Sequence, residues 1–121
     1  MNTKVLTIKE DEEIKEAAKK LLRGDTNHLP VLNNKAQVVG LVTTFDVSKA
    51  LVHPGQKKCV KDVMTRNVIT TTEDEPIDIA AQKLENHNIS ALPVINAQNQ
   101  CIALFHASDL GKLFKSGGKT A

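Results

Sequence analysis

The feature of this sequence that most limits its fold is an internal repeat. When residues 5–51 are laid over residues 68–114 without a gap, roughly eighteen of forty-seven positions are identical. The longest matches are Glu10-Asp11-Glu12 and Leu29-Pro30-Val31, which recur at 73–75 and 92–94. Two copies of one supersecondary unit explain this pattern. A single unit of about 50 residues is too small to bury a good core, so we expect the copies to pack on each other.

Each copy predicts the same order of elements, β-α-β-β-α, and the fold class is α+β. Strands are expected at 5–8, 29–32 and 38–42, and again at 68–71, 92–95 and 101–105. Between the first two strands of each copy, apolar residues recur on one helical face, at Ile14, Ala17, Ala18, Leu21 and Leu22 and at Ile77, Ala80, Ala81 and Leu84. A final helix begins near Phe45, and again near Ser108.

The ends of the first helix in each copy carry their own signals. Gly24 is expected to close the helix of copy one, and Asn86-His87-Asn88 that of copy two. Pro76 suits the first helical position of copy two, because that position needs no N–H donor.

Composition argues against several classes of protein. The formal charge is only +2 and the chain has no Trp or Tyr, so we expect no nucleic-acid partner. No apolar run approaches the roughly 20 residues of a membrane span, and no signal-peptide pattern opens the chain, so we expect a cytoplasmic protein. Cys59, Cys101 and the four histidines lack metal-ligand spacing, and no metal or cofactor is expected. Nothing resembles a nucleophile–base pair or a phosphate loop, so we do not predict an enzyme.

Three runs resemble a known family: residues 61–70 (KDVMTRNVIT), 88–94 (NISALPV) and 40–46 (GLVTTFD). They are similar to a CBS pair, the module named after cystathionine β-synthase and also called the Bateman module. The resemblance implies two β-α-β-β-α units packed with pseudo-twofold symmetry, and a further pairing into homodimers. It also implies an adenosine-containing ligand (AMP, ATP, S-adenosylmethionine or methylthioadenosine) in the cleft between the units, and a regulated partner protein or fused domain.

The repeat and the resemblance together suggest domain boundaries. We assign residues 1–56 to the first CBS repeat, 57–67 to the inter-repeat segment and the start of the second unit, 68–115 to the second repeat, and 116–121 to a flexible tail. The chain begins at the position equivalent to Met64. This start suggests a fragment of a longer protein, although a small standalone protein would look the same.

Thr43-x-x-Asp46 carries the most chemistry. A carboxylate suits a ribose diol because it has two acceptor oxygens and no donor at pH 7. The resemblance gives Asp46 this role, with Thr43 or Thr44 donating to a second ligand oxygen. The same spacing is also a capping box, which needs no ligand. One residue can serve both roles, so both interpretations stay open.

In the family, a pocket that uses one unit's Asp takes its apolar wall from the other unit. The resemblance therefore implies that Asp46 works with Met64, Ile69, Thr70, Ser90, Ala91, Leu92 and Pro93. The alternative for Met64, Ile69 and Leu92 is an ordinary core position. Arg66 is the first choice for a phosphate contact because it adjoins the residues of this apolar wall. The alternative is that Arg66 belongs to an exposed, solvated linker.

A second, weaker site is expected around Asp109. Its other members are Leu6, Thr7, His28, Pro30, His106 and Ser108. His106 replaces the threonine, His28 is far larger than the equivalent Ala91, and the wall must use residues near the chain terminus. The leading function is thus a ligand-sensing regulatory module. The alternative is a structural dimerisation module whose pockets have lapsed.

Overall fold

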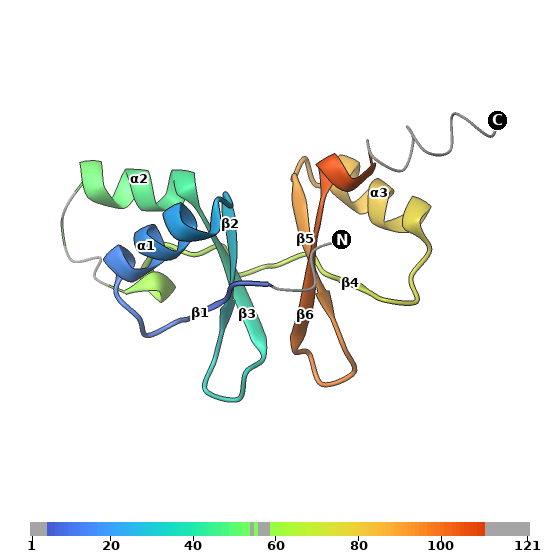
Figure 1. The fold of residues 1–121 in the computed structure, drawn as a ribbon, viewed down its shortest axis with the longest axis horizontal. Helices are drawn as coiled ribbons and strands as arrows, with labels where there is room; N and C mark the ends of the chain where they lie inside the picture. Colours follow the sequence, from blue (N-terminus) through green and yellow to red (C-terminus); the bar gives the residue numbers. More distant parts are fainter. Residues whose placement is uncertain (1–4, 54, 56–58, 111–121) are drawn as a thin grey trace. The chain divides into compact units, whose positions relative to one another are not determined.

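A computed structural model describes residues 5–53, 55 and 59–110 of the 121-residue chain. These residues divide into two compact units (Figure 1). The first unit comprises Leu6–Val68 and Gln98–Gln100. The described residues of the second unit are Val5, Ile69–Ala97 and 101–110.

The first unit is a three-stranded sheet with two α-helices. Its elements are β1 (Ile8–Lys9), α1 (Ile14–Gly24), β2 (His28–Leu32), β3 (Val38–Thr43), α2 (Thr44–Val52) and the 3-10 helix η1 (Val60–Asp62). The strand order is β1-β2-β3, with β1 parallel and β3 antiparallel to β2. Helices α1 and α2 pack against each other. Ala17 and Leu21 of the predicted apolar stripe are buried in the core beneath them, together with Leu29 of β2. Leu22 was also assigned to this stripe, but it is 83% exposed.

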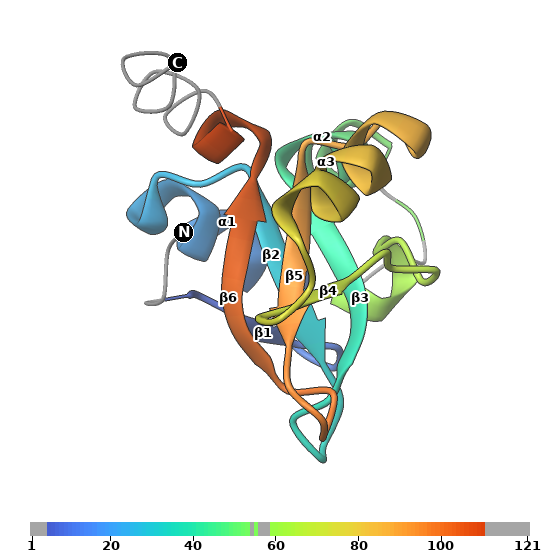
Figure 2. The ribbon, with the colours of Figure 1, turned by 90° about the vertical axis from the view of Figure 1, so that its right-hand side faces the viewer.

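The second unit repeats this pattern with β4 (Thr71–Thr72), α3 (Ile77–Asn86), β5 (Ala91–Ile95) and β6 (Cys101–His106) (Figure 2). Its strand order is β4-β5-β6, again parallel and then antiparallel. The register is the same in both sheets, because the pair His28–Thr43 in one corresponds to Ala91–His106 in the other. The predicted α+β fold class and the tandem repeat are therefore confirmed.

The first strand of each copy is shorter than predicted. Strand β1 begins at Ile8 and β4 at Thr71, three residues later than expected in both cases. Ile8 pairs with Val31 and Thr71 with Val94, so the pairing would next reach Pro30 and Pro93. Proline has no N–H to donate to a strand ladder, and the pairing stops there.

The predicted helix ends need small corrections. Helix α1 does end at Gly24, but the left-handed residue that follows it is Asp25, with φ 48°. A Cβ on Gly24 would meet the end of the Leu6 side chain, which is 41% exposed and has room to move aside. Pro76 is the residue before α3 instead of its first helical residue. Asn88 adopts the left-handed conformation after α3, in agreement with the prediction.

Helix α2 begins at Thr44, as the sequence predicts, and residues 107–110 are also helical. The remainder of that final helix and the predicted tail at 116–121 lie outside the described residues. Within the described ranges, no helix is long and apolar enough to cross a membrane.

Candidate functional site

The Thr43–Asp46 spacing forms a cap at the start of α2. The Asp46 backbone N–H donates to Thr43 Oγ1 at 3.2 Å, and the Thr43 N–H donates to Asp46 Oδ2 at 2.9 Å. These reciprocal bonds are a capping box, so the capping interpretation is confirmed.

This cap leaves hydrogen-bonding capacity on both side chains. Within the described part of the chain, Asp46 uses only Oδ2, and its Oδ1 accepts no hydrogen bond. The Thr43 hydroxyl acts as an acceptor in the cap and retains its own proton. The Thr44 hydroxyl instead donates to Asn27 Oδ1 at 3.2 Å. Of the two threonines, Thr43 is therefore the one with a donor available beside the Asp46 carboxylate.

Copy two keeps half of this cap. The His106 N–H donates to Asp109 Oδ2 at 2.9 Å, which reproduces the backbone bond made by Thr43. A histidine at this position supplies no hydroxyl. The two carboxylates therefore occupy equivalent places beside different chemical groups.

Met64 packs against the middle of β3. Leu41 and Thr65 exchange two backbone hydrogen bonds of 3.0 and 2.9 Å, which hold the segment around Met64 against the strand. Met64 is 8% exposed and belongs to the core cluster of the first unit. Its thioether lies so close to Gly40 that a Cβ on that residue would overlap it. The core interpretation of Met64 is therefore confirmed, and a role as a ligand wall stays a prediction.

The segment before Met64 is anchored to the turn between β1 and α1. The Lys61 backbone N–H donates to the Glu10 carbonyl at 3.0 Å, and its ammonium contacts the Asp11 carboxylate at 3.1 Å. The hydrogen bond with Asp11 raises the pKa of Lys61 above its ordinary value. Arg66 is exposed and donates from Nη2 to the Lys61 carbonyl at 2.9 Å. Because a guanidinium has five N–H donors, most of them stay available to an anion.

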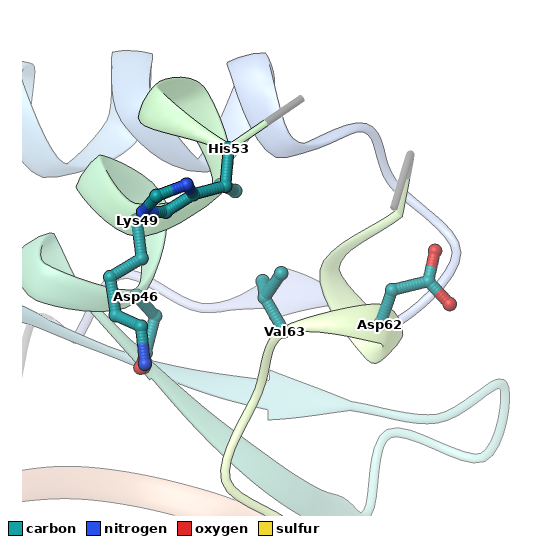
Figure 3. A pocket seen from close by; sticks show the side chains of 6 residues that line it. Asp46, Lys49, His53, Asp62 and Val63 are labelled. Atoms are coloured by element: carbon teal, nitrogen blue, oxygen red, sulfur yellow. The ribbon is translucent and has the colours of Figure 1, made fainter. Parts of the chain in front are cut away.

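A pocket of about 140 Å³ opens beside Asp46 (Figure 3). Helix α2 and the residue after it contribute Asp46, Lys49, Ala50 and His53, and the segment around η1 contributes Asp62 and Val63. Figure 3 shows Val63 across the pocket from the side chains on α2. Ligand pockets for drug-sized molecules are about 300–1,000 Å³, so this one alone has room for only part of a nucleoside.

Lys49 and His53 were missed as candidates in the sequence. Lys49 follows Asp46 by three residues and His53 follows Lys49 by four, which places all three on one face at α2 and its C-terminal end. That spacing could have identified Lys49 and His53 as pocket residues, but it is equally typical of a solvated helix face. Lys49 also lies 5.5 Å from the centre of the Phe45 ring, within range of a cation–π contact.

The second unit brings together the other residues predicted for this pocket. Ser90 is exposed just before β5, and Ala91, Leu92 and Pro93 are buried within it. Leu92 belongs to the core cluster, so alternation along the strand directs Ala91 and Pro93 to the opposite face. The core interpretation of Leu92 is confirmed. Ile69 and Thr70 are half-buried in the segment before β4.

The residues predicted for the second site are also divided between the units. His28 lies directly across from Thr43 on neighbouring strands, although the sequence assigned these two residues to different sites. Leu6 and Thr7 precede β1, and Pro30 is fully buried in β2. His106 ends β6, and Ser108 and Asp109 follow it.

The two repeats and their register agree with a comparison against known protein families. The model of the CBS domain matches residues 1–53 and 60–115. This chain belongs to the CBS domain family. One similar solved structure is the CBS domain pair of protein MJ0100, in complex with 5′-methylthioadenosine and S-adenosyl-L-methionine. It is 38% identical in sequence, with a TM-score of 0.84, and the alignment covers 93% of this chain and 92% of that one.

Two larger proteins are also similar to this CBS pair. The L-aspartate semialdehyde sulfurtransferase of Methanocaldococcus jannaschii is 42% identical over 88% of the chain. A homoserine O-acetyltransferase of Methanococcoides burtonii is 43% identical over 93% of it. The chain spans only 20% and 23% of these relatives' own lengths. Their enzyme names therefore describe proteins of which the CBS pair matches a small part.

Proposed function

We propose that this CBS pair is a ligand-sensing regulatory module that binds an adenosine-containing molecule through residues of both units. The observation that carries the proposal is the 38% identical CBS pair of MJ0100, which was solved with 5′-methylthioadenosine and S-adenosyl-L-methionine. Both ligands contain adenosine next to sulfur, so we take this ligand class as the first choice and AMP or ATP as the second.

The local chemistry of the first unit supports a site at Asp46. A ribose presents two vicinal hydroxyls as donors, and the Asp46 carboxylate retains an oxygen for them after capping α2. Thr43 retains a donor for a ligand oxygen. The neighbouring pocket, lined by Lys49 among others, offers a positive charge to the part of the ligand beyond the ribose.

The apolar wall for the adenine ring would come from Met64, Ile69, Ala91 and Pro93. Ser90 is exposed and small, and its carbonyl already accepts a hydrogen bond of 2.8 Å from the Ala107 N–H. The Arg66 guanidinium would meet a phosphate if AMP or ATP were the ligand. We propose a weaker second site at Asp109 with Leu6, Thr7, His28, Pro30, His106 and Ser108.

Isothermal titration of the wild-type chain and of two matched variants tests this proposal. Asp46→Asn keeps an acceptor for the Thr43 N–H but removes the charge from the ribose contact. A charge-assisted hydrogen bond contributes about 1.5–3 kcal/mol, so affinity for methylthioadenosine should fall about ten- to a hundred-fold. Asp109→Asn is the control and should leave most of the binding intact. Equal losses of affinity in the two variants, or a larger loss in Asp109→Asn, would refute the proposal that the Asp46 site is the stronger one.

The same titration separates the sensor from the alternative of a structural module. The altered cap of copy two makes a lapsed pocket an alternative for the Asp109 site. A folded chain that binds none of methylthioadenosine, S-adenosylmethionine, AMP and ATP at millimolar concentration would refute the sensor. GTP serves as the specificity control, because its purine edge has a different hydrogen-bond pattern.

We further propose that the chain forms a homodimer through its helices and regulates a fused or partner protein. Large apolar side chains are exposed on the helices of the first unit: Leu22 is 83% exposed, Phe45 68% and Val52 71%. Three large exposed apolar side chains on two helices that pack against each other favour an interaction surface on these helices. Light scattering at tens of micromolar protein should give twice the 13.2 kDa chain mass. A value of one chain mass would refute the dimer.

A further inference from the structure

One repeated residue has no part in the core or in the proposed ligand contacts: the lysine at position 20 of copy one and position 83 of copy two. In copy two, the Lys83 ammonium donates to the Thr70 carbonyl at 2.8 Å. In copy one, Lys20 donates to the Thr7 carbonyl, also at 2.8 Å. Both helices therefore hold the residue that precedes the first strand of their own unit.

This contact falls where the sheet gives no support. Strand β4 begins at Thr71, so Ile69 and Thr70 pair with no strand among the residues that the structure describes. The pairing would next reach Pro93, which has no N–H to donate. The hydrogen bond from Lys83 thus fixes the backbone at the point where the strand ladder has ended.

Lys83 is itself held more firmly than Lys20. Its ammonium lies 2.7 Å from Glu75 Oε1, and the same oxygen accepts a 2.6 Å hydrogen bond from the Thr71 hydroxyl. These two hydrogen bonds lower the pKa of the Glu75 carboxyl below its ordinary value. In copy one the equivalent Lys20–Glu12 distance is 3.8 Å. Ile8 stands where copy two has Thr71, so copy one has no hydroxyl to complete the network.

We infer that Lys83 is a positioning residue for the adenine wall, because it fixes the Ile69–Thr70 segment that supplies part of that wall. The inference rests on the proposed function. Lys20 has the same role for Leu6 and Thr7 at the Asp109 site. The two sites therefore depend on two different lysines, neither of which contacts the ligand.

The test compares variants of the full chain by titration with methylthioadenosine at a temperature where circular dichroism shows each one folded. Lys83→Met keeps most of the side-chain volume and removes the donors. We expect it to weaken binding at the Asp46 site about three- to tenfold, as a lost hydrogen bond of ordinary net strength would. Lys83→Arg keeps donors and should restore most of the affinity.

Two controls separate positioning from simple destabilisation. Thr71→Val breaks the bond to Glu75 but leaves the Lys83–Thr70 contact, so it should lower the melting temperature and change the affinity less than twofold. Lys20→Met should spare the Asp46 site. If Lys83→Met binds as tightly as wild type, or if Thr71→Val weakens binding equally, the inference is overturned.

Backbone ¹⁵N relaxation of the ligand-free protein gives a readout that does not need a ligand. Order parameters at Ile69 and Thr70 should be near 0.85 in wild type and fall below about 0.6 in Lys83→Met. If wild type binds no adenosine compound, the proposed ligand is refuted, and relaxation alone then decides the role of the lysine. Loss of order would support it, and unchanged order parameters would overturn it.

Discussion

The close approach of Met64 to Gly40 makes Gly40→Ala the most informative single substitution in the first unit. A Cβ at residue 40 would overlap the Met64 thioether and come within 3.0 Å of the Thr65 carbonyl. The backbone there is fixed by the paired hydrogen bonds between Leu41 and Thr65. The Met64 side chain must therefore move out of the core to make room.

The expected loss in the free energy of unfolding follows from the burial that the Met64 side chain gives up. Exposing a buried side chain of this size costs about 1.5–3 kcal/mol. Alanine regains about 0.5–1 kcal/mol over glycine within a strand, because it restricts the unfolded chain. Gly40→Ala should therefore destabilise the first unit by about 1–2 kcal/mol, which lowers the melting temperature by about 5–10 °C in a domain of this size. If Met64 is a ligand wall, binding should weaken as well.

A double-mutant cycle tests the mechanism as well as the magnitude. Met64→Ala alone should cost about 2–5 kcal/mol through the cavity that it leaves. In that background Gly40→Ala no longer meets the thioether and keeps only the close approach to the Thr65 carbonyl, so its cost should be clearly smaller than in wild type. Thermal unfolding followed by circular dichroism measures the stability of wild type, of the two single variants and of the double variant. An equal cost of Gly40→Ala in both backgrounds would refute the steric argument. Ala103→Gly at the equivalent position of copy two should destabilise, which shows that glycine is not favoured there intrinsically.

The remaining predictions concern acid stability and thiol chemistry. Because its partners lower the pKa of Glu75, this carboxylate adds stability above its ordinary pKa, and that stability is lost as the pH falls through the lower folded value. Melting curves between pH 3 and 6 should show a smaller acid loss in Glu75→Gln than in wild type, and equal losses would contradict the assignment. Burial raises the pKa of the Cys101 thiol, so iodoacetamide should label it more slowly in the folded chain than in urea, as measured by peptide mass spectrometry. Equal rates would show that burial does not protect it.

The sequence predicted those features of the fold that follow from periodicity. The repeat of Leu29-Pro30-Val31 at 92–94 predicted two equivalent sheets, and the registers of β2 and β5 agree with it. The first strand of each copy was predicted too long, because the apolar residues before Ile8 and Thr71 look like strand. Their length depends on Pro30 and Pro93 in a neighbouring strand, and that pairing is not apparent until the register is known.

The candidate site was less accessible to sequence reasoning. Asp46 was found because its spacing from Thr43 is a recognised pattern. Lys49 and His53 were not, because charged residues at helical spacing are common on solvated faces. The role of Lys83 was equally hidden. Its contact with the Thr70 carbonyl spans 13 residues and depends on how α3 packs, not on a local motif.

The capping box explains why spacing alone does not separate a structural aspartate from a ligand-binding one. Holding the start of α2 requires one carboxylate oxygen, and Asp46 uses Oδ2 for it. The same bond fixes the direction of the side chain, so the second oxygen is already oriented before any ligand arrives. A ribose contact then needs no further loss of side-chain freedom, which lowers the entropic cost of binding. In copy two the backbone bond to Asp109 is kept, but the hydroxyl that completes the box is replaced by His106. The two carboxylates therefore share a structural role, and any difference in ligand affinity must come from the groups beside them.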